Sequence, residues 1–394
     1  MAMAEYVGVS AFGLKMGVVL PGADLIRLIM ERIEAVNGDG LLDDNDVLCV
    51  TESLVARTQK NYVTTEEIGE EIRRKMKLRK NGKVGVLFPI VSRNRFSLVL
   101  EGIARAVPEG DVVVQLSYPR DEVGNRIMSD EAGDVITCRH GGCVESRDVE
   151  TPYCHPITGV DYVRLYGDIV AECGACPTIL LCNDPVKILD TKPDAVIVSD
   201  IHTRAQNLQK ISARLSNVRT LQDFFNRDEG NGKAWSEFGL LGSNMSSSGR
   251  LKLAPRQADA FAIELQKALF DTTGKKVEII VNGDGAYKDP TSSIYELADP
   301  RPALGATPGV QSVCREGVKY KYLVDLNHDQ GKSCEEIEQA LKAEKARKKE
   351  QHDASCEGTT PRRMEDVLAS LADLVSGSAD AGTPLVLIKG IYQP

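Results

Sequence analysis

The stretch from Lys275 to Pro300 constrains the fold of this chain most. Its short apolar run, Val277 to Val281, is typical of a buried strand, and it leads into the loop Asn282-Gly283-Asp284-Gly285. The two glycines permit backbone conformations and a close approach that a side chain would prevent. Ligands commonly bind at loops that follow the strands of an α/β sheet. The stretch therefore predicts an α/β protein with a ligand site at the end of this strand.

Acidic residues in and after this loop have two interpretations. Oxygen ligands suit Mg²⁺ or Mn²⁺ better than zinc, so a metal site is one of them. In that interpretation Asp284 is both a metal ligand and a catalytic residue, and further carboxylates complete the shell. The candidate metal ligands are Asp284, Asp289, Glu296 and Asp299. The alternative is an ordinary solvated acidic turn, and the loop alone does not decide between them.

Length and charge restrict the class of protein. A chain of 394 residues exceeds one small core, so two lobes or one domain with a large insertion are expected. The net charge of -9 argues against nucleic acid and anionic membranes as partners. The sequence has no apolar run of about eighteen residues and no basic segment followed by an apolar one at its start. We therefore expect a cytoplasmic enzyme or binding protein.

Ten cysteines in a chain without a signal peptide indicate reduced thiols. Cys173 and Cys176 have the spacing of a zinc knuckle or a redox pair, but no second pair of this kind follows at the usual distance. We favour buried free thiols over a structural zinc. The cluster concerned contains Cys138, Cys143, Cys154, Cys173, Cys176 and Cys182, with His140 and His155 between them.

Hydrophobic periodicity predicts alternating strands and helices. Apolar spacing predicts helices near 24–37, 62–76, 257–270 and 364–375, and apolar runs predict strands at 47–50, 84–91, 112–116, 178–182, 195–199 and 385–389. The central strands are expected to be parallel with short crossovers. Arg93-Asn94-Arg95 follows one of them, and its guanidinium groups suit a carboxylate or phosphate. A surface turn is the equal alternative for this tripeptide.

Three separated segments carry motifs of one enzyme family. The first starts at Gly13-Leu14 and ends at Thr51-Glu52-Ser53-Leu54-Val55-Ala56-Arg57, the second joins Ser243-Asn244 to the strand before Asp284, and the third contains Ser376-Gly377-Ser378-Ala379-Asp380-Ala381-Gly382-Thr383-Pro384. Together they resemble the coenzyme F-420 gamma-glutamyl ligase family. The resemblance implies that Arg57 and Lys15 contact nucleotide phosphates and that Arg57 is catalytic. The residues it implies for nucleotide binding are Lys15, Met16, Glu52, Ser53, Arg57, Asn244, Gly377, Ser378, Asp380, Gly382 and Thr383.

The chain departs from the family in its metal ligands and in its length. Leu241 and Ser378 stand where the family has an acidic ligand, and residues 60 to 240 are mostly additional, so the resemblance covers roughly half of the chain. We expect a ligase-like core of mixed β-sheets with flanking helices, an α+β arrangement, from 1–59 and 239–394. The inserted lobe, 60–238, is then the acceptor side. Its candidate substrate-binding residues are Arg93, Asn94, Arg95, His155, His202 and Arg204.

The implied reaction is formation of a gamma-glutamyl amide between L-glutamate and a small-molecule acceptor similar to coenzyme F-420-0. It uses GTP or ATP and proceeds through an acyl phosphate, with Mg²⁺ or Mn²⁺ and a possible monovalent cation. The resemblance also implies a homodimer. One alternative keeps the fold but glutamylates a folate or another pteridine. Another is a non-catalytic protein that binds a nucleotide or a metal, which the two departures allow.

Overall fold

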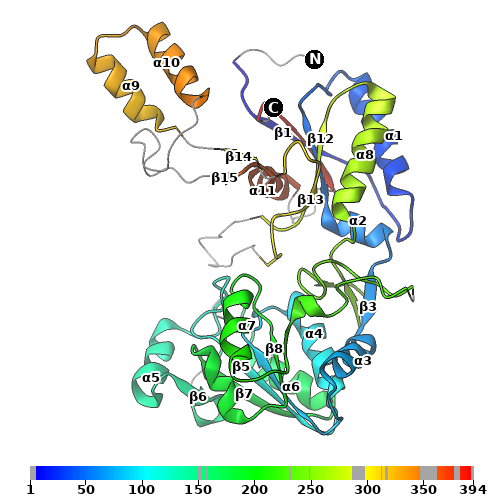
Figure 1. The fold of residues 1–394 in the computed structure, drawn as a ribbon, viewed down its shortest axis with the longest axis vertical. Helices are drawn as coiled ribbons and strands as arrows, with labels where there is room; N and C mark the ends of the chain where they lie inside the picture. The colour runs from blue at the N-terminus through cyan, green and yellow to red at the C-terminus, as the bar shows by residue number, and fades with distance from the viewer. Residues whose placement is uncertain are drawn as a thin grey trace.

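The chain folds into two lobes that lie one above the other in Figure 1. The computed structural model describes residues 6–149, 153–155, 158–230, 232–247, 249–285, 298–311, 313–315, 318–346, 362–376 and 382–391. The first lobe, here called the core lobe, is built around a five-stranded sheet, and the second, the inserted lobe, around a six-stranded sheet. The mixed sheets and flanking helices confirm the predicted α+β class.

The core-lobe sheet joins segments that are distant in sequence. Its strand order is β1-β16-β2-β12-β13. Only β2 and β12 run parallel to each other, and the other neighbours are antiparallel. The N-terminal, central and C-terminal strands therefore lie side by side, as the sequence predicted. The bounds are Ser10–Leu14 for β1, Val47–Thr51 for β2, Glu278–Asn282 for β12, Ala303–Ala306 for β13 and Leu385–Lys389 for β16.

Helices cover both faces of this sheet. Side chains alternate along a strand, so Leu385 and Leu387 of β16 pack with one cluster of buried residues and Val386 and Ile388 with another. The first cluster contains α1 (Leu25–Gly38) and α8 (Ala258–Thr273), and the second contains α11 (Met364–Ser376). Two buried faces explain why these strands read as continuous apolar runs.

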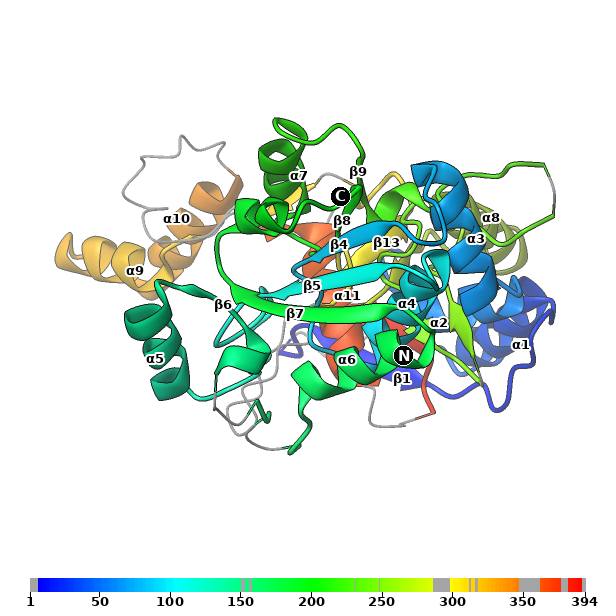
Figure 2. The same cartoon turned by 90° about the horizontal axis from the view of Figure 1, so that it is seen from below.

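The inserted lobe is a parallel sheet with helices on its faces (Figure 2). Its order is β6-β7-β5-β4-β8-β9, and every neighbouring pair is parallel except β6 with β7. The strands are β4 (Lys83–Leu87), β5 (Asp111–Leu116), β6 (Cys143–Glu145), β7 (Cys176–Cys182), β8 (Ala195–Val198) and β9 (Val218–Thr220). The helices are α3 (Thr65–Met76), α4 (Arg93–Ala106), α5 (Asp130–His140), α6 (Tyr162–Glu172) and α7 (Arg204–Ser212).

The strand order of this lobe reverses at β4, because β5 lies on one side of it and β8 on the other. In doubly wound sheets the crevice beyond the carboxyl ends of the strands at such a reversal is the usual ligand site. The chain leaves β4 at Leu87 and enters α4, whose first turn is capped by the Ser92 hydroxyl accepting from the Arg95 amide at 3.3 Å. This turn faces the core lobe.

The chain passes between the lobes twice, and the two passages are adjacent. It leaves the core lobe after α2 (Glu52–Thr58) through β3 (Tyr62–Thr64) and returns through β10 (Asn244–Met245) and β11 (Arg250–Lys252), which form a small sheet with β3. The Gln59 side-chain amide donates to the Arg256 carbonyl at 2.8 Å and accepts from the Arg256 amide at 3.0 Å. Leu251 and Leu253 still pack in the core of the inserted lobe.

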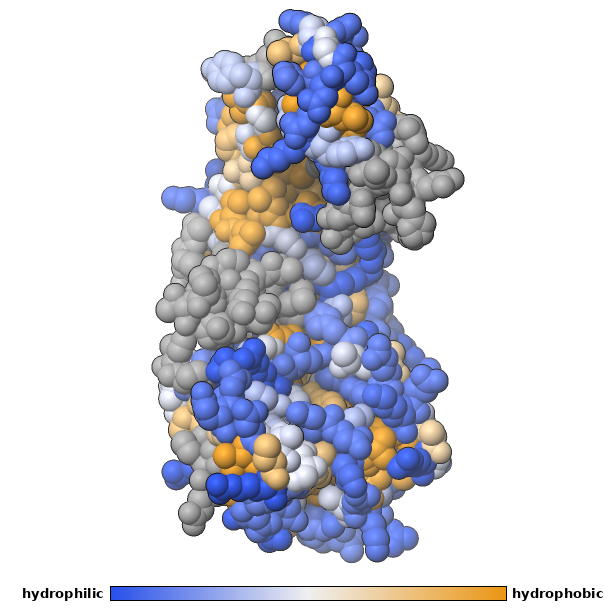
Figure 3. Space-filling view, turned by 90° about the vertical axis from the view of Figure 1, so that its left-hand side faces the viewer, coloured by the Kyte–Doolittle hydropathy of each residue, from blue (hydrophilic) through white to orange (hydrophobic). Residues whose placement is uncertain are grey.

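A helical hairpin, α9 (Tyr320–Asp329) and α10 (Cys334–Ala346), projects from the core lobe near the short strands β14 (Cys314–Arg315) and β15 (Arg362–Arg363). The face shown in Figure 3 is mostly hydrophilic, with a larger hydrophobic patch in its upper half and smaller ones in its lower half. Tyr320, Tyr322 and Leu326 of α9 are exposed. Among the described residues, the structure contains no helix whose length and apolar character would let it cross a bilayer.

Candidate functional site

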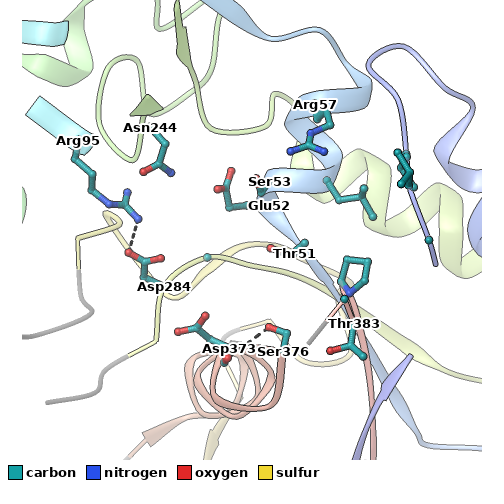
Figure 4. Close-up of a pocket in the computed structure, with 17 residues that line it drawn as sticks. Thr51, Glu52, Ser53, Arg57, Arg95, Asn244, Asp284, Asp373, Ser376 and Thr383 are labelled. Carbon is teal, nitrogen blue, oxygen red and sulfur yellow. Dashed lines mark hydrogen bonds and ion pairs between the residues drawn. The ribbon is translucent and has the colours of Figure 1, made fainter. Parts of the chain in front are cut away.

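A cleft of about 610 Å³ lies where β2 and β12 end. These strands are parallel, so the residues that follow them emerge at the same edge of the sheet. Figure 4 shows Thr51, Glu52 and Ser53 entering from β2 and α2, Asp284 from the loop after β12, and Asp373 and Ser376 from the end of α11. The cleft thus combines residues of the first, second and third motif segments, Asn244 of the second among them, with Arg95 of the inserted lobe.

The Arg95 guanidinium joins two carboxylates of the core lobe. Its Nη1 donates to Asp299 Oδ1 at 2.7 Å and its Nη2 donates to Asp284 Oδ2 (Figure 4). The other Asp299 oxygen accepts from the Asp284 amide at 2.8 Å. A Cβ at Gly283 would collide with the Asp299 carboxylate, so this glycine permits the close approach. The space that the glycine loop offers is therefore filled by Asp299.

Burial shapes the charges of this group. It raises the pKa of Asp284 to about 7, and Asp299 adds to this effect while Arg95 opposes it. Burial also raises the pKa of Asp373, although its Oδ2 accepts from the Gly285 amide at 2.7 Å. Burial disfavours the charged form of Arg95, but Asp299 and Asp284 outweigh it and raise the pKa of the guanidinium. Arg95 is thus a fixed positive charge among three carboxylates.

A second buried ion pair lies at the start of α2. Lys252 Nζ of β11 donates to both Glu52 carboxylate oxygens, at 2.8 and 2.7 Å. Both residues are buried. Glu52 therefore has its charge balanced by a lysine of the sheet that joins the lobes. Ser53 and Arg57 lie on the same helix and line the cleft, and they take no part in the pair between Lys252 and Glu52.

Two further cavities adjoin the cleft. One of about 360 Å³ lies beyond the carboxyl end of β4 and is lined by Ser92, Asn94, His155, Thr158 and Tyr162, among others. It shares Arg95, Asn244, Asp284 and Asp373 with the cleft. The other, of about 630 Å³, shares Ser53, Arg57 and Asn244 with the cleft and extends along Tyr62 and Lys252. All three cavities meet at Asn244.

His155 is buried on the wall of the 360 Å³ cavity. Burial lowers its pKa, and the charge of Arg126 lowers it further. Because an unperturbed histidine titrates near pH 6.5, His155 is neutral at pH 7. It offers this cavity a neutral imidazole rather than a cation.

The structure brings together most of the residues that the sequence assigned to the nucleotide. Glu52, Ser53, Arg57, Asn244, Gly382 and Thr383 line the cleft. Lys15 is exposed and does not line the cleft, whereas Gly17, Val18 and Val19 of the same segment do. Met16 packs against the buried apolar cluster that contains α1 and α8. Gly377, Ser378 and Asp380 lie outside the described residues.

The predicted acceptor residues separate into two groups. Asn94, Arg95 and His155 line the 360 Å³ cavity. Arg93 is exposed, and His202 and Arg204 lie at the start of α7, where the His202 amide donates to Glu122. Of these described residues, Arg93, His202 and Arg204 line none of the three cavities. Their role in substrate binding stays a prediction.

The predicted metal ligands are only partly described. Asp284 and Asp299 lie together, and Asp289 and Glu296 fall outside the described residues. Within the described part of the chain, no group of three or more His, Cys, Asp or Glu residues could hold a metal ion. Asp284 and Asp299 turn toward Arg95, and Leu241, where the resemblance implied an acidic ligand, is buried in the inserted lobe. The described carboxylates do not fit a metal ion held by the protein alone.

Sequence reasoning missed several residues of the cleft. Asp373 lies in the last turn of α11, just before the third motif segment, and Ser376, the first residue of that segment, was not assigned to the nucleotide. Lys252, which lines the adjoining 630 Å³ cavity, was overlooked as well, although a lysine in a buried short strand needs a buried partner. Gly17 to Val19 lie within the first motif segment and could have been included on that ground.

The cysteine cluster contains free thiols. Cys143 and Cys182 face each other on β6 and β7, and burial together with Cys143 raises the pKa of Cys182 to about 12. Cys138, Cys154 and Cys176 are exposed, so the expectation of buried thiols is wrong for these three. A thiol with a raised pKa is a poor nucleophile and a poor metal ligand, so Cys182 is structural.

The comparison with protein families agrees with this geometry. The model of the family described as F420-0:Gamma-glutamyl ligase matches residues 13–390, which includes the inserted lobe, so the expectation that the resemblance covers only about half of the chain is wrong. No curated protein matches the chain. The match begins in β1 and ends directly after β16, so it covers both edges of the cleft and everything between them. The chain therefore belongs to the F420-0:gamma-glutamyl ligase family.

Proposed function

We propose that this chain is a GTP- or ATP-dependent ligase that joins L-glutamate to a small-molecule acceptor similar to F420-0 through a gamma-glutamyl amide. One observation carries the proposal: the 610 Å³ cleft and the 360 Å³ cavity share Arg95, Asn244, Asp284 and Asp373. A ligase of this class must hold a phosphate donor and a carboxylate acceptor with their reacting atoms in contact. Two cavities with a common wall supply that arrangement.

The cleft suits the nucleotide. Arg57 contributes a guanidinium to both the cleft and the 630 Å³ cavity, and guanidinium groups bind phosphate oxygens in a bidentate manner. Ser53 and Asn244 add a hydroxyl and an amide beside it. We propose that Mg²⁺ or Mn²⁺ accompanies the nucleotide phosphates, whose oxygens are suitable ligands, and that a monovalent cation is a further candidate.

The cavity of the inserted lobe suits the acceptor. Tyr162 offers an aromatic ring, His155 a neutral imidazole, and Asn94 and Asn125 offer amides that can donate and accept. Flat heteroaromatic rings with carbonyl and NH groups are bound by this combination. The same chemistry would accept a pteridine, so a folate remains an alternative acceptor.

The reaction can be written in two steps. A substrate carboxylate oxygen attacks the terminal phosphorus of the nucleotide, the nucleoside diphosphate leaves, and an acyl phosphate forms. The amine of the second substrate then attacks the acyl carbon, inorganic phosphate leaves, and the amine nitrogen loses a proton. Arg95 and Arg57 provide positive charge where phosphate oxygens are transferred, which is the main contribution a protein can make to such a step.

The test is an assay with labelled glutamate, GTP or ATP, Mn²⁺ and a panel of F420-0 and folate acceptors. We expect a product one glutamate heavier with F420-0. Asn244→Ala should lower turnover at least about tenfold, because Asn244 lines all three cavities. Arg27→Ala, an exposed change on α1, is the control and should leave turnover unchanged.

The outcomes separate the alternatives. A glutamylated product with folate alone would replace the acceptor and keep the ligase. Nucleotide binding without any product from the whole panel would favour a non-catalytic nucleotide-binding protein and contradict the proposal.

A further inference from the structure

We propose that Arg95 takes the place of a divalent ion bound by the protein. Its guanidinium binds Asp284 and Asp299, the two carboxylates that such an ion would need as ligands. The inserted lobe supplies this arginine. The inference concerns the site of the proposed ligase and takes its catalytic meaning from that function, but its test is metal binding and does not depend on turnover.

The geometry of the pair supports a permanent arrangement. Each of the two terminal nitrogens of Arg95 binds a different carboxylate, and Asp299 is held at both oxygens, by Arg95 Nη1 at 2.7 Å and by the Asp284 amide at 2.8 Å. A divalent ion would have to displace a guanidinium from both carboxylates at once. Asp299 is only 1% exposed, so water cannot replace the lost partner cheaply.

The surroundings explain why the arginine is needed. Asp284, Asp299 and Asp373 are brought together at the end of β12 and α11, and burial raises the cost of their charges. Lys252 is a second buried cation on this side of the molecule, but both of its short contacts go to Glu52. Arg95 is therefore the residue that balances the Asp284 and Asp299 pair.

Two positions of the chain agree with this arrangement. The resemblance to the family implies acidic ligands where Leu241 and Ser378 stand, and Leu241 is buried among apolar residues. The arginine comes from α4 of the inserted lobe, which lies within the residues that the family model matches. Two carboxylates can bind one guanidinium but are too few to hold a divalent ion by themselves.

Functionally, the arginine places a fixed charge at the wall between the nucleotide cleft and the acceptor cavity. It would contact the transferred phosphate from the protein side. The chain would then need only the divalent ion that arrives with the nucleotide.

The test is Mn²⁺ binding without nucleotide, followed by electron paramagnetic resonance of the free ion. We expect weak binding to the wild-type chain and binding at least about tenfold tighter to Arg95→Met, because this change leaves two carboxylates available to the metal. The double variant Arg95→Met/Asp284→Asn should return to weak binding. Arg95→Lys keeps a charge and should bind as weakly as the wild type.

Arg57→Met is the matched control, because Arg57 lines the same cleft but is not bonded to Asp284, and it should leave Mn²⁺ binding unchanged. If Arg95→Met does not fold, the wild-type titration still decides. Micromolar Mn²⁺ binding by the wild type that Asp284→Asn abolishes would overturn the inference. Equal Mn²⁺ affinity in folded Arg95→Met and wild type would overturn it too. Absence of ligase activity would affect only the proposed function.

Discussion

The two lobes both place carboxylates just beyond the ends of parallel strands, and they neutralise them in different ways. In the core lobe, Asp284 follows β12 and is paired with Arg95 of the other lobe. In the inserted lobe, Glu122 follows β5, and its carboxylate accepts from the amides of Ile201, His202 and Thr203 after β8. The first arrangement uses a side chain from across the cleft, and the second uses backbone groups of the same lobe.

This difference distinguishes the candidate functional site, at Asp284 and Arg95, from a purely structural contact, at Glu122. Backbone amides at the start of a helix are in place as soon as the lobe folds, so the Glu122 contact is complete without the core lobe. The contacts of the cleft exist only when the lobes are docked, and they leave charge next to open cavities. Mutations should therefore show large coupling between the lobes at the cleft and local effects at Glu122.

The largest expected effect comes from a charge pair that also involves the sheet between the lobes. Lys252→Met leaves the Glu52 carboxylate buried without a cation, and we expect the free energy of unfolding to fall by about 3–5 kcal/mol. Urea denaturation measures it. The double change Glu52→Gln/Lys252→Met removes both charges and should recover most of the loss. A loss below about 1 kcal/mol in Lys252→Met would show that water or another cation reaches Glu52.

An intermediate effect is expected at Asp200, beside the Glu122 contact. It is fully buried, and burial raises its pKa to about 6, with Glu122 adding to the effect. Between about pH 4 and pH 6 the folded chain keeps a proton that the unfolded chain has lost, so stability falls as pH rises through this window. Asp200→Asn cannot release a proton. We expect it to gain about 2 kcal/mol on the wild type between pH 4 and pH 7.

Urea midpoints of both chains at several pH values check this. Asp121, whose pKa is also about 6, is present in both chains and cancels in the difference. A constant gap between the two chains across the window would contradict the prediction.

The smallest effect is expected for Glu122→Gln. The variant keeps one accepting oxygen, but its NH₂ group cannot accept from the amides that bonded to the other carboxylate oxygen. Because Glu122 is only half-buried, water can accept from those amides, so we expect a loss of about 1 kcal/mol. Hydrogen exchange should quicken at Ile201 to Thr203, with nucleotide affinity unchanged. Weakened nucleotide binding would mean that the contact of the inserted lobe is coupled to the cleft after all, and the contrast between the two lobes would fail.

The strands of the core-lobe sheet could be predicted from the sequence, because their burial on both faces requires continuous runs of apolar residues. The last strand, at 385–389, has the predicted bounds, and the strand before Asp284 is shifted by one residue, to Glu278–Asn282. Strands covered on both faces are continuous apolar runs, which sequence reading detects. The polar residues after β2 and β12 were located for the same reason.

The pairings across the cleft could not be predicted in this way. Arg95 and Asp284 are 189 residues apart, and their contact depends on how two folded lobes dock. Composition gives no sign of this, and Arg93 and Arg95 look alike in sequence although one is exposed and the other bridges two carboxylates. Asp373 sits in an amphipathic helix, where an acidic residue usually faces solvent.

The adjacent passages of the chain between the lobes show how this protein could be shortened. Gln59 and Arg256 are hydrogen-bonded neighbours, so a chain that joined one directly to the other would still connect α2 to α8. The core sheet would lose none of its strands, because all five come from outside this interval. One continuous segment between these two residues therefore carries the whole parallel-sheet lobe, and with it the arginine that faces Asp284.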